Sequence, residues 1–560
     1  MTKAITVKVV GPAGTGIKTS GQLLAQILVD QNYYTHDYTE YPSLVRGGHN
    51  THQVSFSSEK INAPFFKTQI LFSLKPDHWQ QHKNELEKNS LIFSDQKIEK
   101  KINSGKLISF PLSELVKKVG NPITANIICL GTTAFLADLD QKLSLSTIKK
   151  YFGQKAKDNL TAFKVGFDFA EKTYQKLKLK TEKPKKKIAK VLLDGNESFG
   201  WGFLKGKGDF YAAYPMTPST GTLHFLAGKA KEKKIVVIHP EDEIAVASMA
   251  TGAAFAGKRA AVGTSGGGFA LMTETVSFCG IAEIGMVFYL VSRPGPATGM
   301  PTWTGQTDLL FAVFSGHGEF PKIVLAPGDQ EESRQMGWQA LNLAENLQTP
   351  IIVISDKFLG ESIKSVDDPA KEKVVVNRGK LLKLAPKNFA RYNWQPACGR
   401  SPRTIPGIAG GQFLANSYEH DQKGIATEDA LVAQKMFEKR ARKEKAALSL
   451  TPKPILHGSK NPKKLIISWG STKGPILEAL KMISGNDFGF LQVKTVWPLH
   501  PEIERIISKA EKIIVVENNQ KSQLTTLLKT KFNFNPDRQI LKFNGRPFFP
   551  EELYEKFKKL

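Results

Sequence analysis

Four segments between residues 211 and 310 constrain the fold more than any other part of the chain. They read YPMTPST (214–220), HPEDEIAVASMATGAAFAG (239–257), GTSGGGFALMTE (263–274) and SRPGPATGMPTWTGQTDL (292–309). Each is a Gly/Pro-rich or acidic junction beside an apolar run, which is typical of loops at strand ends and helix starts in an open α/β sheet. Because ligands bind such sheets at the carboxyl ends of strands, the segments predict a ligand site.

Length and hydropathy indicate a large soluble protein. At 560 residues the chain is too long for one core, and we expect roughly three or four domains. No apolar run reaches the ~18–20 residues of a membrane span, and the best candidate, GIAEIGMVFYLVS, is short and contains Glu283. The start, MTKAITVKVVGPAG, lacks the long apolar core of a signal peptide. We therefore expect a cytoplasmic protein without a membrane partner.

Three isolated cysteines, Cys129, Cys279 and Cys398, exclude several kinds of site within this chain. They cannot supply a disulfide framework, a tetrahedral zinc site or a four-thiolate iron–sulfur cluster. If the protein performs redox chemistry, its electron carrier must lie on another subunit. His49 and His52 form an HxxH pair, but the expected strand geometry and the lack of a matching third ligand favour a non-metal role. We therefore predict no metal site in this chain.

The formal net charge of +26 is compatible with nucleic acid, an acidic partner or phosphorylated ligands. Much of the charge is scattered, apart from two runs at residues 180–190 and 435–445, and no nucleic-acid fold signature accompanies it. Lysines that cover solvated faces explain this pattern, so we expect no nucleic-acid partner.

In their order, the four segments resemble the α subunit of the 2-oxoacid:ferredoxin oxidoreductases, thiamine-diphosphate enzymes that oxidatively decarboxylate 2-oxo acids to acyl-CoA. The resemblance covers nearly the whole chain. SPRTIPG (401–407), SYEHDQKG (417–424) and FEKRARK (437–443) resemble the family's connecting region, and ISWGSTKG (467–474) resembles its transketolase-C-terminal-like domain. The N-terminal part resembles the γ domain, so the arrangement is that of a fused γα chain.

Strand–helix alternation along the chain predicts a multi-domain α/β fold. It begins with a strand, ITVKVV (5–10), a glycine turn and a helix, SGQLLAQILVD (20–30). With the resemblance, this predicts a γ-type α/β domain, a basic linker, a thiamine-diphosphate pyrimidine-binding α/β domain, a connecting region and a transketolase C-terminal-like α/β domain. Their expected bounds are 1–175, 176–190, 191–365, 366–462 and 463–560.

Glu243 is the candidate for activating thiamine diphosphate. That cofactor requires one protein carboxylate against its aminopyrimidine ring, in a dry place where the interaction is not screened. Glu243 opens an apolar helix and matches the family's activating glutamate, whereas Glu241 and Asp242 are its neighbours. The alternative is that these acids only complement a helix N-terminus.

The turn YPMTPST is the candidate substrate loop. It places Thr217 and Ser219 beside prolines, which restrict the backbone and so present the hydroxyls at a fixed angle. Thr217 matches the family's substrate threonine and could donate to a keto or carboxylate oxygen, while Tyr214 and Pro215 are expected to line the site. A simple capped turn is the alternative.

Arg293 follows an apolar strand and precedes PGP. An arginine at a strand end can grip a carboxylate with two parallel hydrogen bonds, and this one lines up with the family's substrate arginine. A surface ion pair is the alternative. In GTSGGGF, glycines allow a close approach of substrate or cofactor, so Thr264, Ser265 and Gly266 are expected to line the site.

The N-terminal loop GPAGTG (11–16) lacks the lysine of a P-loop and is only a distorted dinucleotide fingerprint. Its amides and the following helix start could still bind a phosphate. An RGG at residues 46–48 also recurs in γ domains, which in this family are thought to help bind coenzyme A. The resemblance therefore gives a set of coenzyme A candidates: Gly11, Gly14, Gly16, Arg46 and Gly47.

The resemblance implies an α subunit that works only with a separate β subunit. The β subunit would supply the diphosphate and Mg²⁺ site and an iron–sulfur cluster, and ferredoxin would accept the electrons. Coenzyme A would be the co-substrate and 2-oxoglutarate the first expected acid, with pyruvate or a branched-chain acid as alternatives. A transketolase-like transferase would require a GDG…N signature, which we do not find in this sequence. A non-catalytic scaffold subunit remains the other alternative.

Overall fold

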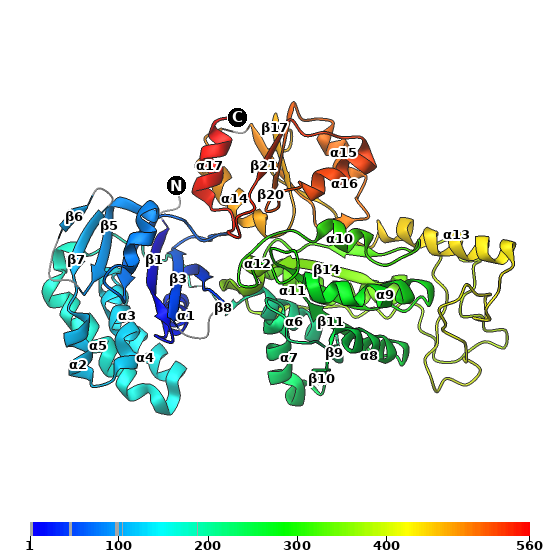
Figure 1. Ribbon diagram of the computed structural model, residues 1–560, viewed down its shortest axis with the longest axis horizontal. Coiled ribbons are helices and arrows are strands. Elements are labelled where there is room, and N and C mark those ends of the chain that lie inside the picture. The colour runs from blue at the N-terminus through cyan, green and yellow to red at the C-terminus, as the bar shows by residue number, and fades with distance from the viewer. Residues whose placement is uncertain (1–3, 44–46, 96–99, 103–104, 188, 486) are drawn as a thin grey trace.

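The computed structural model describes residues 4–43, 47–95, 100–102, 105–187, 189–485 and 487–560. Three sheets organise them (Figure 1): one in the N-terminal part, drawn in blue, one in the central green part, and one in the orange and red C-terminal part. The C-terminal part lies above the other two in this view, while the yellow connecting region extends away from the N-terminal part.

The first sheet has nine strands and is mixed, since β1 pairs with β4 in parallel and with β3 antiparallel. Its order is β6 (Lys100–Ile102), β7 (Gly105–Ser109), β5 (Leu86–Ser94), β4 (Thr68–Ser73), β1 (Ile5–Ala13), β3 (Gly47–Ser57), β2 (Tyr34–Glu40), β15 (Lys364–Asp367) and β8 (Lys190–Leu193). The helices of this part are α1 (Ile17–Asp30), α2 (Leu112–Val119), α3 (Ala125–Leu136), α4 (Gln141–Phe152) and α5 (Ala156–Thr173). Thus two strands that flank the central segment, β8 before it and β15 after it, complete the N-terminal sheet.

The second sheet is parallel except at one edge. Its order is β10 (Val236–Ile238), β9 (Phe210–Ala212), β11 (Ala260–Thr264), β12 (Val287–Ser292), β14 (Ile351–Asp356), β13 (Ile323–Leu325) and β19 (Thr495–Trp497), the last being antiparallel. Its helices are α6 (Gly195–Lys205), α7 (Thr220–Lys233), α8 (Glu243–Phe255), α9 (Gly266–Ile281), α10 (Leu309–Phe314), α11 (Gln330–Leu347) and α12 (Lys357–Glu361).

The third sheet comes from the C-terminal part. Its order is β16 (Ile455–Gly458), β18 (Phe488–Gln492), β17 (Lys464–Ser468), β20 (Lys512–Glu517) and β21 (Arg538–Leu541). Its helices are α14 (Lys473–Met482), α15 (Glu502–Ile507), α16 (Gln523–Phe532) and α17 (Pro550–Lys558). One continuous apolar core joins the second and third sheets, since Val262 and Phe288 pack in the same cluster as Leu465 and Ile467.

The connecting region contains the helix α13 (Ala430–Ala447). Buried ion pairs attach this helix to the part of the chain that forms the second sheet. Lys439 and Lys443 of this helix both reach Glu283, which lies between α9 and β12. All three side chains are almost completely buried. The basic run 435–445 therefore lies on a helix, and part of its charge is buried instead of covering a solvated face, because Glu283 neutralises it.

The predicted α/β multi-domain class is confirmed, as are the strand at residues 5–10 and the helix that follows it. The domain bounds remain predictions. Over the described ranges, the helices are all too short or too polar to cross a membrane.

Candidate active site

The four sequence segments meet at one edge of the second sheet. The strands β10, β9, β11 and β12 are adjacent and parallel, so their carboxyl ends lie side by side. Thr217 follows β9, Glu243 follows β10, Thr264 ends β11 and Arg293 follows β12. The expectation that these segments lie at strand ends of an open α/β sheet is therefore confirmed.

Glu243 is the first residue of α8, and only 4% of it is exposed. Its neighbour Asp242 caps the helix, since the Asp242 side chain accepts from the Ala245 N–H at 2.8 Å. The Glu243 Oε1 atom is buried and accepts no hydrogen bond from any described residue. Burying a carboxylate oxygen without a donor is unfavourable, so this atom is suited to a donor from outside the chain.

The turn at residues 214–220 is held from within and from two sides. Ser219 is buried, and its hydroxyl donates to the Met216 carbonyl at 2.8 Å, so it stabilises the turn. Thr217 is half-buried, and its carbonyl accepts from Arg293 Nη1 at 2.6 Å. Tyr214 and Pro215 are exposed, and the Tyr214 ring packs edge-on against His239. The structure therefore brings two of the candidate substrate residues, Thr217 and Arg293, into direct contact.

Arg293 is half-buried, and burial lowers the pKa of its guanidinium, an effect that Asp308 opposes. Its Nη2 and Nε atoms donate to no described residue, which leaves part of the guanidinium fork for an anionic ligand. Asp308 accepts from the Ser292 hydroxyl at 2.6 Å. Burial raises the pKa of Asp308, an effect that its hydrogen bonds and Arg293 oppose.

The glycine loop (265–268) connects β11 to α9, with Gly266–Gly268 forming the first turn of that helix, and lies beside Glu243. A Cβ atom at Gly268 would lie 2.2 Å from Thr264 Oγ1 and 2.6 Å from Glu243 Oε1, so only glycine leaves both side chains in place. A Cβ at Gly266 would likewise lie 2.8 Å from Asp308 Oδ2. The Ser265 hydroxyl is buried and has no hydrogen-bond partner among the described residues. The segment 264–268 thus lies close to both Glu243 and Asp308, and its role as site lining stays a prediction.

These residues fit an aminopyrimidine ring. A ring nitrogen that donates a hydrogen bond would satisfy the buried Glu243 Oε1, and the missing side chains of the glycine loop leave room beside that oxygen. A carboxylate at a helix N-terminus, in a place from which water is largely excluded, also interacts more strongly than it would in solvent.

The coenzyme A candidates lie on the first sheet. β1 and β3 pair so that Ala13 faces Gly47 and Gly11 faces Asn50, which brings the loop 11–16 beside Gly47. Gly16 adopts φ = 75°, and its carbonyl accepts from Asn126 Nδ2 at 2.6 Å. Gly14 is exposed, with φ = 86°. Arg46 lies outside the described residues.

The two histidines of the HxxH pair take different partners. His52 Nε2 contacts Asp37 Oδ2 at 2.8 Å, whereas His49 contacts His78 at 3.2 Å and His82 at 2.7 Å. Burial and the two neighbouring imidazoles lower the pKa of His49 to about 4. His49 and His82 line a cavity of about 720 Å³. Trp303, from the segment 292–309, and Arg546, from the C-terminal part, also line it. All three parts of the chain therefore border this cavity.

The exposed side of α8 and α9, two helices of the second sheet, carries large apolar side chains. Helices α8 and α9 carry apolar residues on all sides, yet Ile244 (54% exposed) and Leu271 (50% exposed) face outward. A helix that is apolar all round is normally buried. Phe314 on α10 and Leu414 in the connecting region are also exposed. A partner surface would remove these side chains from water.

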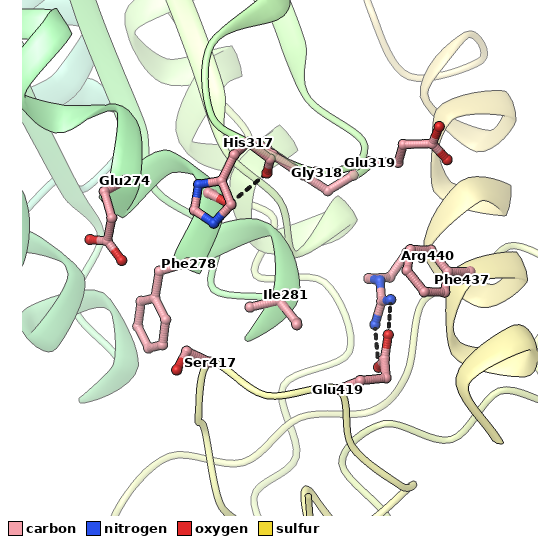
Figure 2. A pocket seen from close by; sticks show the side chains of 12 residues that line it. Glu274, Phe278, Ile281, His317, Gly318, Glu319, Ser417, Glu419, Phe437 and Arg440 are labelled. Atoms are coloured by element: carbon pink, nitrogen blue, oxygen red, sulfur yellow. Dashed lines mark hydrogen bonds and ion pairs between the residues drawn. The ribbon is translucent and has the colours of Figure 1, made fainter. Parts of the chain in front are cut away.

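A small pocket of about 180 Å³ lies between α9, residues 317–320 and the connecting region. Figure 2 shows Glu419 and Arg440 facing each other across one side of it, and Arg440 Nη1 donates to Glu419 Oε1 at 3.0 Å. None of its lining residues belongs to the predicted site. Its Glu274 and Phe278 also line a second groove, of about 490 Å³, along α8.

Sequence reasoning missed two residues of the site. Asp308 stands in the quoted segment 292–309 but was given no role there. Asn196, on α6, donates to the Pro218 carbonyl at 2.9 Å. For Asp308 the available signal was an acid that follows a Gly/Thr-rich loop at a helix start. For Asn196 it was only the helix-capping pattern of DGNE.

Comparison with known proteins shows which family the chain resembles. Two family models match: "Pyruvate flavodoxin/ferredoxin oxidoreductase, thiamine diP-bdg" at residues 202–439 and "Pyruvate ferredoxin/flavodoxin oxidoreductase" at residues 6–169. The 2-oxoacid:ferredoxin oxidoreductase subunit alpha of Sulfolobus sp. is 31% identical, over 97% of this chain and 95% of its own. The chain belongs to the 2-oxoacid:ferredoxin oxidoreductase α-subunit family.

Two further members of this oxidoreductase family refine the comparison. The 2-oxoglutarate synthase subunit KorA of Methanothermobacter thermautotrophicus is 27% identical and covers 64% of this chain and 96% of its own. The solved 2-oxoglutarate:ferredoxin oxidoreductase from Magnetococcus marinus, with 2-oxoglutarate, coenzyme A and succinyl-CoA bound, is 26% identical. Each chain is covered completely, with a TM-score of 0.94.

Proposed function

We propose that this chain is the catalytic α subunit of a 2-oxoacid:ferredoxin oxidoreductase. The reaction converts a 2-oxo acid, coenzyme A and two oxidised ferredoxins into acyl-CoA, carbon dioxide, a proton and two reduced ferredoxins. The observation that carries the proposal is the buried, unpartnered Oε1 of Glu243 at the shared edge of four parallel strands.

In this proposal Glu243 holds the aminopyrimidine of thiamine diphosphate through a hydrogen bond to a ring nitrogen. Thiamine diphosphate, when bound, supplies the nucleophilic carbon and the electron sink that decarboxylation of a 2-oxo acid requires. Thr264 and the glycine loop border Glu243 and exclude water from it. Exclusion of water strengthens the interaction of the carboxylate with the ring.

Arg293 and Thr217 bind the 2-oxo acid. The free nitrogens of Arg293 grip its carboxylate, while Nη1 stays on the Thr217 carbonyl and fixes the guanidinium plane. The Thr217 hydroxyl donates to the keto or carboxylate oxygen. 2-Oxoglutarate is the first acid to test, because KorA and the solved Magnetococcus marinus enzyme are named for it. Pyruvate and branched-chain acids are the alternatives.

Coenzyme A binds through the N-terminal part, where the loop with Gly11, Gly14 and Gly16 leads into α1 and Ala13 of that loop pairs with Gly47. Arg46 would add a cation to that site. The helix start is suited to a phosphate because its first N–H groups have no intrahelical acceptors.

A separate β subunit completes the enzyme. It holds Mg²⁺ and the diphosphate, carries the iron–sulfur cluster and passes electrons to ferredoxin. The outward apolar face of α8 and α9 supports such a partner, since its exposed side chains leave water only when another surface covers them. We place the assembled enzyme in the cytoplasm.

The test is anaerobic reduction of a low-potential viologen dye by this chain co-expressed with the subunit encoded beside it. The assay requires coenzyme A and is run with 2-oxoglutarate, pyruvate and branched-chain acids in turn. Reduction dependent on both co-substrates supports the proposal and names the acid. A stable, cofactor-loaded complex that reduces no dye with any acid would instead favour the scaffold alternative.

A further inference from the structure

The substrate turn is fixed by two side-chain donors on consecutive carbonyls. Arg293 Nη1 donates to the Thr217 carbonyl at 2.6 Å, and Asn196 Nδ2 donates to the Pro218 carbonyl at 2.9 Å. Arg293 follows β12, whereas Asn196 belongs to α6. The two donors therefore come from different elements and together fix the two successive peptide planes that follow Thr217, those of Thr217–Pro218 and Pro218–Ser219.

Asn196 is fixed in one orientation by its surroundings. Only 1% of it is exposed, and its Oδ1 accepts from the Tyr289 hydroxyl at 3.2 Å. The Thr222 hydroxyl donates to the Asn196 backbone carbonyl at 3.1 Å. A Cβ atom at Gly221 would lie 2.9 Å from Nδ2, so the helix start after the turn packs directly against the amide. With its oxygen occupied by Tyr289, the amide can present only its NH₂ group to the turn.

Helix α6 itself is anchored at its N-terminus. Asp194 and Glu197 form a reciprocal capping box, in which the Asp194 side chain accepts from the Glu197 N–H at 2.7 Å. Asn196 lies between these two residues, so the capping box fixes the position of its backbone independently of the contact with the turn. The position of the Pro218 carbonyl is therefore set by α6 and not by the turn alone.

We infer that Asn196 is a positioning residue for 2-oxo acid binding, which acts through the Pro218 carbonyl on the angle at which Thr217 and Arg293 meet the substrate. The inference rests on the proposed substrate roles of those two residues. Loss of the Asn196 donor frees one of the two fixed peptide planes, so the substrate is held in a less favourable geometry. The expected consequence is a higher KM for the 2-oxo acid, with a smaller change in kcat.

Asn196→Asp gives this inference a chemical signature. A protonated aspartic acid can still donate a hydrogen bond to the Pro218 carbonyl, whereas an aspartate cannot and faces that oxygen with a negative charge. The titratable groups around this position are Asp194 and Glu197 at the start of α6 and Tyr289 on β12. Glu361 and Lys18 act on Asp194 with opposite signs, and Asp356 acts on Tyr289. Burial and these acids hold an introduced carboxyl in its neutral form to a higher pH than in water.

The experiment measures KM and kcat for the 2-oxo acid from pH 5.5 to 8.5, with the variants in the co-expressed complex. For Asn196→Asp, we expect the KM ratio to wild type to rise from near 1 at low pH to about 10 or more at high pH, in line with the loss of a buried hydrogen bond. Tyr289→Phe is the matched control, since it removes one of two donors to Oδ1 but keeps the Nδ2 donor. The Thr222 hydroxyl, 3.4 Å from Oδ1, still holds the amide in its orientation. The KM of this control is expected to stay within about 3-fold of wild type at every pH.

Asn196→Ser covers the case in which the aspartate variant does not fold. Its short side chain does not reach the carbonyl, so KM is expected to rise about 5-fold or more without a pH trend relative to wild type. A flat KM ratio for Asn196→Asp, or a wild-type KM for Asn196→Ser, would overturn the inference. If the wild-type complex itself reduces no dye with any acid, the proposed function fails first, and the two failures are thus distinguishable.

Discussion

Two buried glutamates of this protein, Glu283 and Glu243, behave in opposite ways. Glu283 is 1% exposed, and its oxygens contact Lys439 Nζ at 2.5 Å and Lys443 Nζ at 2.6 Å. Although burial alone would raise the pKa of Glu283, the two ammonium groups hold it well below its ordinary value. Glu243 is 4% exposed, yet its Oε1 has no donor within the described chain.

The difference separates a structural carboxylate from a ligand-binding one. The charge of Glu283 is neutralised by lysines of its own chain, and the ion pairs attach α13 to the segment between α9 and β12. Its role therefore requires no other molecule. Glu243 lies at the edge where four strand ends meet, and its unfilled oxygen represents an unfavourable state that a ligand would relieve. The same substitution, Glu→Gln, should therefore have opposite effects at the two positions.

Glu243→Gln should give the largest effect on activity. The amide keeps the volume but loses the charge that holds the aminopyrimidine, so we expect kcat to fall by about 100-fold or more. The unfolding midpoint should change little, because no described partner is lost. Dye-reduction kinetics and thermal unfolding of the same complex measure both quantities. Retention of wild-type kcat would remove Glu243 from the site.

Glu283→Gln should reverse that pattern. Removal of the charge leaves two buried ammonium groups without a counter-charge, which is expected to destabilise the protein by about 3–5 kcal/mol. Burial lowers the pKa of Lys443 to about 7 and that of Lys439 to about 8, while Glu283 opposes both shifts. Since these lysines lose their protons as pH rises, the destabilisation should shrink between pH 6 and 9.

Denaturant unfolding of wild type and Glu283→Gln at both pH values tests this prediction. The kcat of the folded fraction should stay near that of wild type. An equal loss of stability at the two pH values would contradict the explanation that the loss comes from the protonated Lys439 and Lys443.

Gly268→Ala tests whether space beside Glu243 is required. The added methyl would lie 2.6 Å from Glu243 Oε1 and 2.2 Å from Thr264 Oγ1, so one of these side chains must move. We expect a loss of about 10-fold or more in kcat/KM, equivalent to about 1.4 kcal/mol. Gly267→Ala is the matched control, because its Cβ would meet no described atom within 4 Å beyond its chain neighbours and the backbone of its own helix, and alanine favours a helix. Equal effects of the two variants would contradict the prediction.

Arg293→Lys should give the smallest effect of this series. Lysine keeps a cation but lacks the planar fork, so it cannot hold the Thr217 carbonyl and a carboxylate in one plane. We expect KM for the 2-oxo acid to rise about 10-fold while kcat changes less. Steady-state kinetics at fixed coenzyme A measure this, and an unchanged KM would place Arg293 outside the substrate site.

Local patterns were sufficient to predict the elements around the site. The apolar runs before Thr264 and Arg293 are the strands β11 and β12, and the helix that begins at Glu243 starts where its acidic N-terminus predicts. Each of these features depends on residues adjacent in sequence. The grouping of the four segments followed, because neighbouring parallel strands end at the same edge.

Features that depend on distant residues were not predictable in this way. The strand at residues 364–367 joins the N-terminal sheet, where Lys364 pairs with His36 more than 300 positions away. No local signal marks Asn196 as a donor to Pro218, nor Glu283 as the partner of two lysines on α13. Side chains that serve tertiary contacts resemble ordinary polar residues until the fold brings their partners together.

The central claim is that the carboxylate of Glu243, whose Oε1 has no donor among the described residues, binds the cofactor. Calorimetric titration of thiamine diphosphate with Mg²⁺ into the cofactor-free complex, for wild type, Glu243→Gln and Glu283→Gln, tests it most directly. We predict at least about 10-fold weaker binding for Glu243→Gln, as expected when a hydrogen bond to a charged group is lost. The folded Glu283→Gln complex should bind as wild type does. Equal affinity of wild type and Glu243→Gln would contradict the claim.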